Sequence, residues 1–308
     1  MLLPMAEDSN RHYLPEWLLR KFRRPTLFEL DIHSGGISQR NPKKAASAPD
    51  LWPDDIEDKL SVHDSLAARI YRERIYGQRS IVLSDSERWD FAQWLTQFFV
   101  RVPTAIERAH QYLAAQGGVN DVAQKMTLQK RTEILQIIRD QNPATYDNAV
   151  SELGKKDVED HFIEQVAKRF ADTKYLPDAN TIRQHYMRHH RSDRFAQCLI
   201  EYEWVWLTSK VGFVIGDNPL VCWHMKTQRW NYGIGRKGVE ITMPLGRNLC
   251  LRLQRVHPPR GGYLIPCDER TTRQYNCRQR LAAIKHVYGS SESLLDFVSK
   301  PIIGWSPS

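Results

Sequence analysis

The sequence WVWLTSKVGFVIGDNPLVCW, residues 204–223, decides the fold class of this chain. Its runs at 205–207 and 211–215 consist mainly of β-branched, aromatic and other apolar residues, a composition typical of strands. The turn-forming residues GDNP at 216–219 separate these runs from a third one at 220–223. We therefore expect three strands here, and with them a sheet in the C-terminal third of the chain.

Downstream of this stretch the sequence continues first with strands and then with helices. The apolar runs at 239–243 and 249–253 predict two more strands. A helix is expected at about 269–285, and a short one around 293–299 closes the chain. We expect the strands of this region to be antiparallel.

The N-terminal part of the chain contains a predicted β-hairpin. Residues 26–31 alternate between polar and apolar, the turn follows at 33–36 with its Gly-Gly pair, and the pattern resumes at 37–39. Neither this hairpin nor the C-terminal strands can bury a face alone, because isolated two-stranded units are at best marginally stable. We therefore expect sheet residues from the two ends of the chain to meet.

The middle of the chain is predicted to be helical. One helix begins at Asp54-Asp55 and runs to Ile70, and another is capped by Ser84 or Ser86. The second carries carboxylates in its first turn, the end where they are favoured. Its apolar stripe comprises Trp94, Phe98, Ala105 and Tyr112.

Further helices are expected at 122–140, 147–173 and 180–202. The predicted fold class is therefore α+β, with an N-terminal hairpin, a large helical middle, and C-terminal antiparallel strands with closing helices. We predict one domain over residues 1–308, within which 117–200 forms a helical insertion or lid.

The composition is that of a globular protein. Of the 308 residues, 41% are hydrophobic and 26% are charged. No apolar run approaches the roughly 18 residues that a membrane helix needs, and the apolar stretch at 2–6 is too short for a secretory signal. The five cysteines form no CxxC pair. We therefore expect a reduced, cytoplasmic protein without a zinc knuckle, a disulfide framework or a membrane partner.

The positive charge of the chain is unevenly distributed. The net charge is +8, and residues 247–285 contain nine basic and two acidic residues, a local balance of 9 − 2 = +7. Such a field suits a polyanion, namely RNA, DNA or a nucleotide, although an ordinary basic surface gives the same count. The candidate nucleic-acid-binding residues are Arg247, Arg273, Arg278 and Arg280.

The last three of these arginines belong to the predicted helix at 269–285, where they flank an apolar stripe. They would neutralise phosphates if this face meets nucleic acid, or lie along the edge of the core if it does not. The stripe comprises Cys277, Leu281, Ile284 and Tyr288.

Several short segments follow one another in a characteristic order along the chain. They are NRHYLP at 10–15 with LLRKF at 18–22 (pattern HYxPxxxLxxF), PKKA at 42–45, Ile56-Glu57 opening a helix, FFVRVP at 98–103 (an RxP segment inside a helix), GDNPL at 216–220, and a helix from Tyr275-Asn276 to Val287-Tyr288. In this order they resemble the segments of an uncharacterised prokaryotic family, domain of unknown function 4238 (DUF4238). The resemblance implies the fold and brings no activity with it. The family usually shows a second acidic residue after the first helical Glu, where this chain has Val62-His63-Asp64.

Arg101 is the most informative single residue of these segments. It falls on the same helical face as Trp94 and Phe98, with Pro103 disturbing the helix after it. A guanidinium on an apolar face cannot lose its charge and must meet an anion. We expect Arg101 to be largely buried. It either forms an ion pair, to Asp217 or Glu57, or clamps a phosphate or carboxylate ligand.

Three further residues complete the candidate catalytic set. His12 is a candidate general acid or base, because histidine is the residue type most often used for that chemistry. Asp217 with Asn218 lies where a buried strand ends and is a candidate orienting or metal-binding pair. The alternatives are a histidine ring that caps backbone groups and ordinary turn chemistry. A catalytic role requires that His12, Arg101 and Asp217 share one pocket.

Other motifs predict no cofactor or metal. His185 and His189 are one helical turn apart, next to His190, but arginines surround them and the spacing fixes no third ligand. The glycine pairs at 35–36 and 233–235 lack the strand–GxGxxG–helix context of a dinucleotide site. The cofactor therefore stays open.

Three functions fit this sequence. The leading hypothesis is a nucleic-acid-processing enzyme, a phosphodiesterase or nuclease of the defence or toxin type. The second is a non-catalytic module that binds RNA, DNA or protein and in which Arg101 and Asp217 form a structural ion pair. The third is an enzyme for a small anionic substrate.

Overall fold

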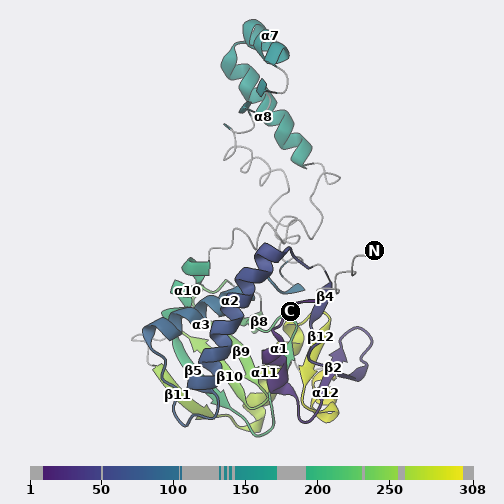
Figure 1. Cartoon of the computed structure of the whole chain (residues 1–308), viewed down its shortest axis with the longest axis vertical. Helices are drawn as coiled ribbons and strands as arrows, with labels where there is room; N and C mark the ends of the chain where they lie inside the picture. Colours follow the sequence, from purple (N-terminus) through teal and green to yellow (C-terminus); the bar gives the residue numbers. More distant parts are fainter. Residues whose placement is uncertain are drawn as a thin grey trace, which may run out of the picture. The chain divides into compact units, whose positions relative to one another are not determined.

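The computed structural model describes residues 10–49, 51–103, 143–171, 192–230, 233–255 and 261–300, together with positions 105, 132, 135–136 and 139–140. The chain divides into two compact units (Figure 1). Unit 1 comprises Met1–Ala105 and Arg183–Ser308, and unit 2 comprises Ile106–Ile182. The expected insertion at 117–200 overlaps unit 2, and its role as a lid within a single domain stays a prediction.

Unit 2 contains a pair of helices, α7 (Pro143–Leu153) and α8 (Lys155–Ala171). The sequence analysis predicted one helix at 147–173, which was wrong. Gly154 lies between the two helices with a φ of +84°, a conformation that ends a right-handed helix and that glycine adopts without strain. The expected helix at 122–140 lies largely outside the described residues.

The larger sheet of unit 1 has six strands in the order β11-β5-β10-β9-β7-β8. Four of them confirm the strands predicted from sequence, and their pairings are antiparallel as expected. The edge strand β11 was not predicted and runs parallel to β5. The strands are β5 (Glu203–Thr208), β7 (Val221–His224), β8 (Arg229–Trp230), β9 (Val239–Gly246), β10 (Leu249–Gln254) and β11 (Gly261–Pro266).

A second sheet has four strands in the order β3-β2-β12-β6 and joins the two ends of the chain, as predicted. The hairpin of β2 (Leu27–Asp31) and β3 (Ile37–Arg40) is confirmed, and β2 pairs with β12 (His286–Gly289). The sequence and the family resemblance both placed residues 286–288 at or near a helix end, and the structure corrects this to a strand. β6 is short (Ile215–Gly216), and β1 (Asn10–His12) and β4 (Ser47–Pro49) form a separate two-stranded sheet.

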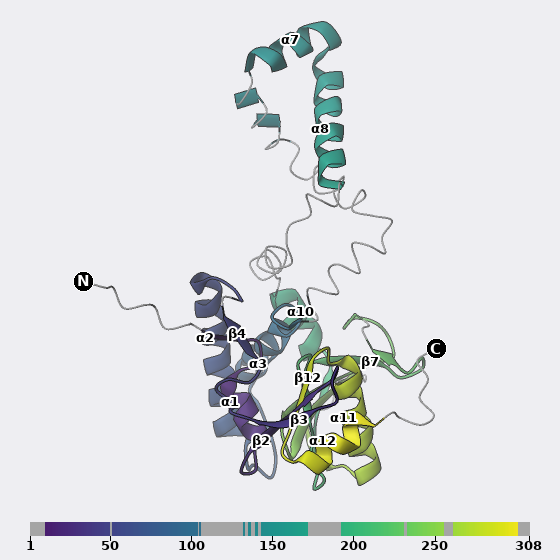
Figure 2. The ribbon, with the colours of Figure 1, turned by 90° about the vertical axis from the view of Figure 1, so that its right-hand side faces the viewer.

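Helices cover both sheets of unit 1 (Figures 1 and 2). The aromatic core on one face of the six-stranded sheet lies beneath α2 and α3, where Phe91 packs edge-on against Trp204 and Trp206. α11 lies on the opposite face, and α12 packs on the four-stranded sheet through a smaller cluster. The helices of unit 1 are α1 (Glu16–Leu19), α2 (Asp54–Ile70), α3 (Asp85–Gln97), α10 (Ser192–Ile200), α11 (Glu269–Ala282) and α12 (Glu292–Ser299), with single turns η1 (Arg20–Phe22) and η2 (Tyr71–Ile75). In the part of the chain that is described, no helix is long and apolar enough to cross a membrane.

α3 begins as the sequence predicts but ends earlier. Ser84 and Glu87 form a capping box at its start. The N–H groups of residues 98–100 bond to carbonyls three residues back, so the chain leaves the helix through a tight turn. Arg101 therefore lies in the turn after α3 and not on the helix, while Pro103 and Ala105 are again helical. The expected disturbance of the helix near Pro103 is thus a full interruption at residues 98–102.

α11 buries a polar face, whereas the sequence analysis predicted an apolar one. The stripe from Cys277 to Leu281 is only half-buried, while Asn276 and Gln279 are fully buried. Asn276 accepts from the N–H of Val214 (3.0 Å) and donates to the carbonyl of Gly212 (2.9 Å). These side chains bind backbone groups that a neighbouring strand would otherwise bind, and so most of the predicted strand at 211–215 is not a strand.

Candidate functional site

Arg101 is buried, as the sequence predicts, with 2% of its surface exposed. Its guanidinium forms a two-pronged ion pair with Asp64, from Nη1 to Oδ1 (2.8 Å) and from Nη2 to Oδ2 (3.1 Å). Nη2 also donates to the backbone carbonyl of His12 (2.7 Å). The structure therefore corrects the expected partners, Asp217 and Glu57: the carboxylate that reaches Arg101 is that of Asp64, two turns after Glu57 on α2, whereas Glu57 accepts from the indole Nε1 of Trp52.

Asp64 is the centre of this arrangement. Besides Arg101 it accepts a hydrogen bond from the indole Nε1 of Trp94 (2.9 Å) on α3. Asp64 thus connects α2 with α3 and with the turn after α3, and Arg101 extends the connection to strand β1 through the His12 carbonyl. A bidentate arginine–carboxylate pair contributes interaction energy and also fixes the relative orientation of the two side chains. We call Arg101 and Asp64, with their contacts to Trp94 and the His12 carbonyl, the Arg101 strut, because they hold these elements at a fixed distance.

The ring of His12 also contacts the backbone. Its Nε2 lies 3.0 Å from the carbonyl oxygen of Lys43, in the loop before β4, and the side chain is half-buried. This is the alternative in which the histidine caps a backbone group. His12 and Arg101 are neighbours, but through the His12 carbonyl and not through its imidazole.

Asp217 fastens the turn that joins α11 to β12. Its buried carboxylate accepts from the N–H groups of Ile284 (2.8 Å), Lys285 (2.7 Å) and His286 (3.0 Å). Burial raises the pKa of this carboxyl, and the three N–H donors oppose the rise. Asn218 adds a bond from Nδ2 to the carbonyl of Ala282 (3.2 Å). We call this group of contacts the Asp217 clamp.

Gly216 explains why the clamp fits so closely. A Cβ at this position would lie 2.9 Å from the Cβ of Ala283 and 2.9 Å from the carbonyl of Gln279, closer than such atoms approach. The Gly216 N–H instead donates to Gln279 Oε1 (3.0 Å). The GDNP motif therefore docks a turn onto the end of α11. The idea that His12, Arg101 and Asp217 share one pocket stays a prediction.

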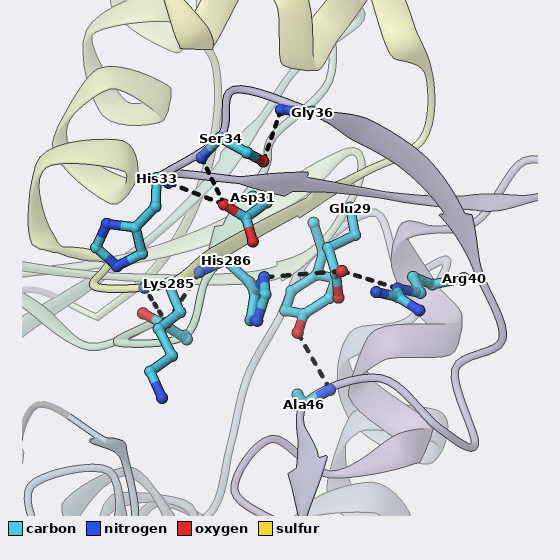
Figure 3. Close-up of polar contacts among 11 residues, drawn as sticks. Glu29, Asp31, His33, Ser34, Gly36, Arg40, Ala46, Lys285 and His286 are labelled. Carbon is cyan, nitrogen blue, oxygen red and sulfur yellow. Dashed lines mark hydrogen bonds and ion pairs between the residues drawn. The ribbon is translucent and has the colours of Figure 1, made fainter.

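The sequence analysis missed a polar cluster on the four-stranded sheet (Figure 3). Glu29 on β2 is buried and accepts from Arg40 Nε (2.8 Å), and its Oε1 lies 3.7 Å from Nδ1 of His286 on β12. The only sequence signal was the polar alternation of Glu29 and Asp31 along a strand.

Tyr288 links this cluster to the N-terminal segment. It lies opposite Glu29 in the strand register, and its hydroxyl accepts from the N–H of Ala46 (3.1 Å). The hydroxyl is also hydrogen-bonded to the side chain of Tyr13, and burial raises the pKa of Tyr288 well above its ordinary value. Tyr13 and Tyr288 belong to two of the segments that resemble the family, so these segments meet in the core.

The four predicted nucleic-acid-binding arginines do not form one exposed face. Arg278 is buried and ion-paired with Glu240, which corrects the expectation that it faces a partner. Arg273 is exposed but pairs with Glu269 and lies over the ring of Phe297 (4.3 Å). The other two, Arg247 and Arg280, are half-buried.

No group of three or more His, Cys, Asp or Glu side chains suited to a metal occurs among the residues that the structure describes. His185, His189 and His190 lie outside those residues.

A basic surface that the sequence analysis did not single out lies upstream of these arginines. We call residues 225–238 the β7–β8 wing, because they include the turn after β7, the edge strand β8 and the loop back to β9 (Figure 2). The wing contains four basic residues and no acidic one, a pattern readable from the sequence alone. All four are exposed, namely Lys226, Arg229, Arg236 and Lys237.

The wing is held to unit 1 by its backbone. The N–H of Met225 donates to the carbonyl of Gly238 (2.9 Å), which closes its base. The hydroxyl of Tyr202 donates to the carbonyl of Ile234, whose side chain is buried in the core. The wing is therefore attached to the rest of unit 1 at Met225, Ile234 and Gly238.

Of the comparisons with known proteins, the one with family models gives a match. No curated protein and no solved structure matches it. The family model described as "Protein of unknown function (DUF4238)" matches residues 10–293. That match includes the His12 segment, the Arg101 strut, the Asp217 clamp and the β7–β8 wing, and it means that this protein belongs to the DUF4238 family.

Proposed function

We propose that this protein binds nucleic acid without acting on it through His12, Arg101, Asp217 or Asn218, and that the β7–β8 wing is its contact surface. One observation carries the proposal. Four exposed cations lie within 14 residues that contain no acidic side chain, on a backbone fastened to the core. β-ribbons with basic side chains are a recurrent means of contacting the nucleic-acid backbone.

The side chains of the candidate catalytic set have other tasks, and this supports a binding role over catalysis by them. Arg101 holds Asp64 and a backbone carbonyl, and Asp217 holds three backbone amides. The alternative foreseen from the sequence, a binding module with a structural arginine–aspartate pair, therefore fits better. The aspartate of that pair is Asp64.

The test removes two cations from the wing. The double variant Lys226→Ala/Lys237→Ala should bind labelled RNA and DNA oligonucleotides more weakly than the wild type. The slope of log affinity against log salt concentration should also be shallower for this variant. The expected change is about 0.9 per lost phosphate contact on duplex DNA and about 0.7 on a single strand. The measurement is fluorescence anisotropy at several salt concentrations.

The matched control is Lys59→Ala/Lys210→Ala, which removes the same charge from two other exposed positions. This control should keep the wild-type salt dependence. Equal losses in both double variants would mean that net charge, and not the wing, attracts the nucleic acid. A wild-type protein that binds no oligonucleotide at low salt would refute the proposal.

A further inference from the structure

Beneath the β7–β8 wing lies an ion pair between a strand and a helix. Arg278 Nη1 on α11 is 2.5 Å from Glu240 Oε1 on β9, and only 7% and 4% of the two side chains are exposed. The other carboxylate oxygen of Glu240 lies 3.9 Å from Nε of Arg252 on β10. A charge buried this deeply cannot reach a phosphate, but it fixes the distance and orientation of the two elements that carry it.

The guanidinium of Arg278 also lies over two aromatic rings. Its centre is 5.0 Å from the ring centroid of Trp223 on β7 and 5.0 Å from that of Tyr275 on α11. Trp223 lies opposite Glu240 in the strand register, so the ion pair and the ring contacts fasten the same point of the sheet. Cation–π contacts of this kind are strongest when desolvated.

The same side chain reaches the wing directly. Nη2 of Arg278 lies 3.8 Å from Sδ of Met225, the first residue of the wing. Met225 is exposed over 43% of its surface, so this contact lies at the boundary between the core and the wing. Arg278 thus contacts β9, β7 and the base of the wing from one position on α11.

We propose that Arg278 is a positioning residue, which holds the base of the β7–β8 wing against α11 in the orientation that binds nucleic acid. This inference rests on the proposed function. It assigns Arg278 a role in binding without contact with the nucleic acid, in contrast to Lys226 and Lys237. Loss of Arg278 should therefore weaken binding while the number of phosphate contacts stays the same.

The first variant is Arg278→Lys. It keeps a positive charge beside Glu240 but removes the planar guanidinium and its contacts with the two aromatic rings. We expect affinity for a labelled RNA oligonucleotide to fall about tenfold with an unchanged salt slope, because no phosphate contact is lost. Limited digestion with trypsin should cut the wing faster than in the wild type, with the cut sites assigned by mass spectrometry. In Lys226→Ala/Lys237→Ala the salt slope should fall, and cutting at the remaining wing arginines should not accelerate.

A second variant separates loss of positioning from loss of folding. Glu240→Leu/Arg278→Met removes both charges of the pair at similar side-chain size. Arg252 loses its more distant contact with Glu240, but a quarter of its side chain is exposed to water. Circular dichroism should show it folded, and it should also be cut faster in the wing. Either variant with wild-type affinity would overturn the positioning role, and a shallower salt slope in Arg278→Lys would show direct phosphate contact instead. Absence of oligonucleotide binding by the wild type would refute the proposed function, whereas wing cutting at the wild-type rate in both variants would refute the role of Arg278 in holding the wing.

Discussion

The Arg101 strut and the β7–β8 wing place positive charge in opposite surroundings. Arg101 is buried against a carboxylate and a backbone carbonyl, and all of these groups belong to the protein. Lys226 and Lys237 are exposed in a segment without acidic residues. Charges that the fold already neutralises stabilise the fold, whereas charges left in water remain able to attract a partner.

The Asp217 clamp extends this comparison to negative charge. Its carboxylate is buried and accepts hydrogen bonds from three backbone amides of the same unit. The segments by which the chain resembles its family thus contain residues that join distant parts of unit 1. We expect changes in them to affect stability first, and changes in the wing to affect binding first.

The largest effect is expected at the clamp. Asp217→Ala leaves three amide donors without their acceptor, and unsatisfied donors destabilise by about 1 kcal/mol or more each, so the free energy of unfolding should fall by roughly 3 kcal/mol. Denaturant unfolding followed by circular dichroism measures this. The exposed Asp58→Ala is the control and should change stability by no more than about 0.5 kcal/mol. A loss of that small size in Asp217→Ala would mean that the clamp does not hold the turn.

The next largest effect is expected at the strut. Arg101→Met leaves Asp64 without its cation, although Trp94 still donates to it and 20% of its side chain is exposed. The loss of stability should therefore be about 2–3 kcal/mol, at or below the range for a fully buried pair. Thermal and denaturant unfolding of this variant measure it.

Adding Asp64→Leu to Arg101→Met should restore part of that stability, because no buried charge is then unpaired. Oligonucleotide binding by the folded fraction should stay at the wild-type level. A variant that folds normally but loses binding would make Arg101 a ligand clamp and would contradict the contrast between strut and wing.

The smallest effect is expected at His63, next to Asp64. Burial lowers the pKa of this half-buried histidine, although Asp64 opposes the shift. The unfolded chain, with an ordinary pKa near 6.5, therefore takes up the proton first, so His63 destabilises the fold as the pH falls through and below that value.

His63→Asn should accordingly lose less stability than the wild type between about pH 7 and pH 5. Urea unfolding at both pH values, compared with the exposed variant His33→Asn, measures the difference. If the pH dependence of stability in His33→Asn equals that of the wild type, the difference seen in His63→Asn is due to the burial of His63. Parallel pH curves for His63→Asn and the wild type would show that the ring does not titrate differently on folding.

The local alternation of apolar and polar residues predicted those helices and strands whose buried side chains recur with the regular period of a helix or a strand. The hairpin of β2 and β3, helix α2 and strands β5, β7, β9 and β10 lie where the sequence placed them. The pattern failed at α11, because its buried face is polar and bonds to backbone groups more than sixty residues away in the chain. It also failed for β12, which becomes a strand only by pairing with β2 and β6.

The sequence by itself determined that the fold is α+β, that the two ends of the chain share a sheet, and that Arg101 is buried. The first two follow from the spacing of apolar and polar residues, which is local information. The burial of Arg101 was predicted correctly, but from a helical face that in the structure ends before Arg101. Only the tertiary structure decided that Asp64 pairs with Arg101, that Glu240 pairs with Arg278, and that all four cations of the β7–β8 wing are exposed. A charge is neutralised by whatever lies within a few ångströms of it, and those neighbours come from segments that only the folded chain brings together.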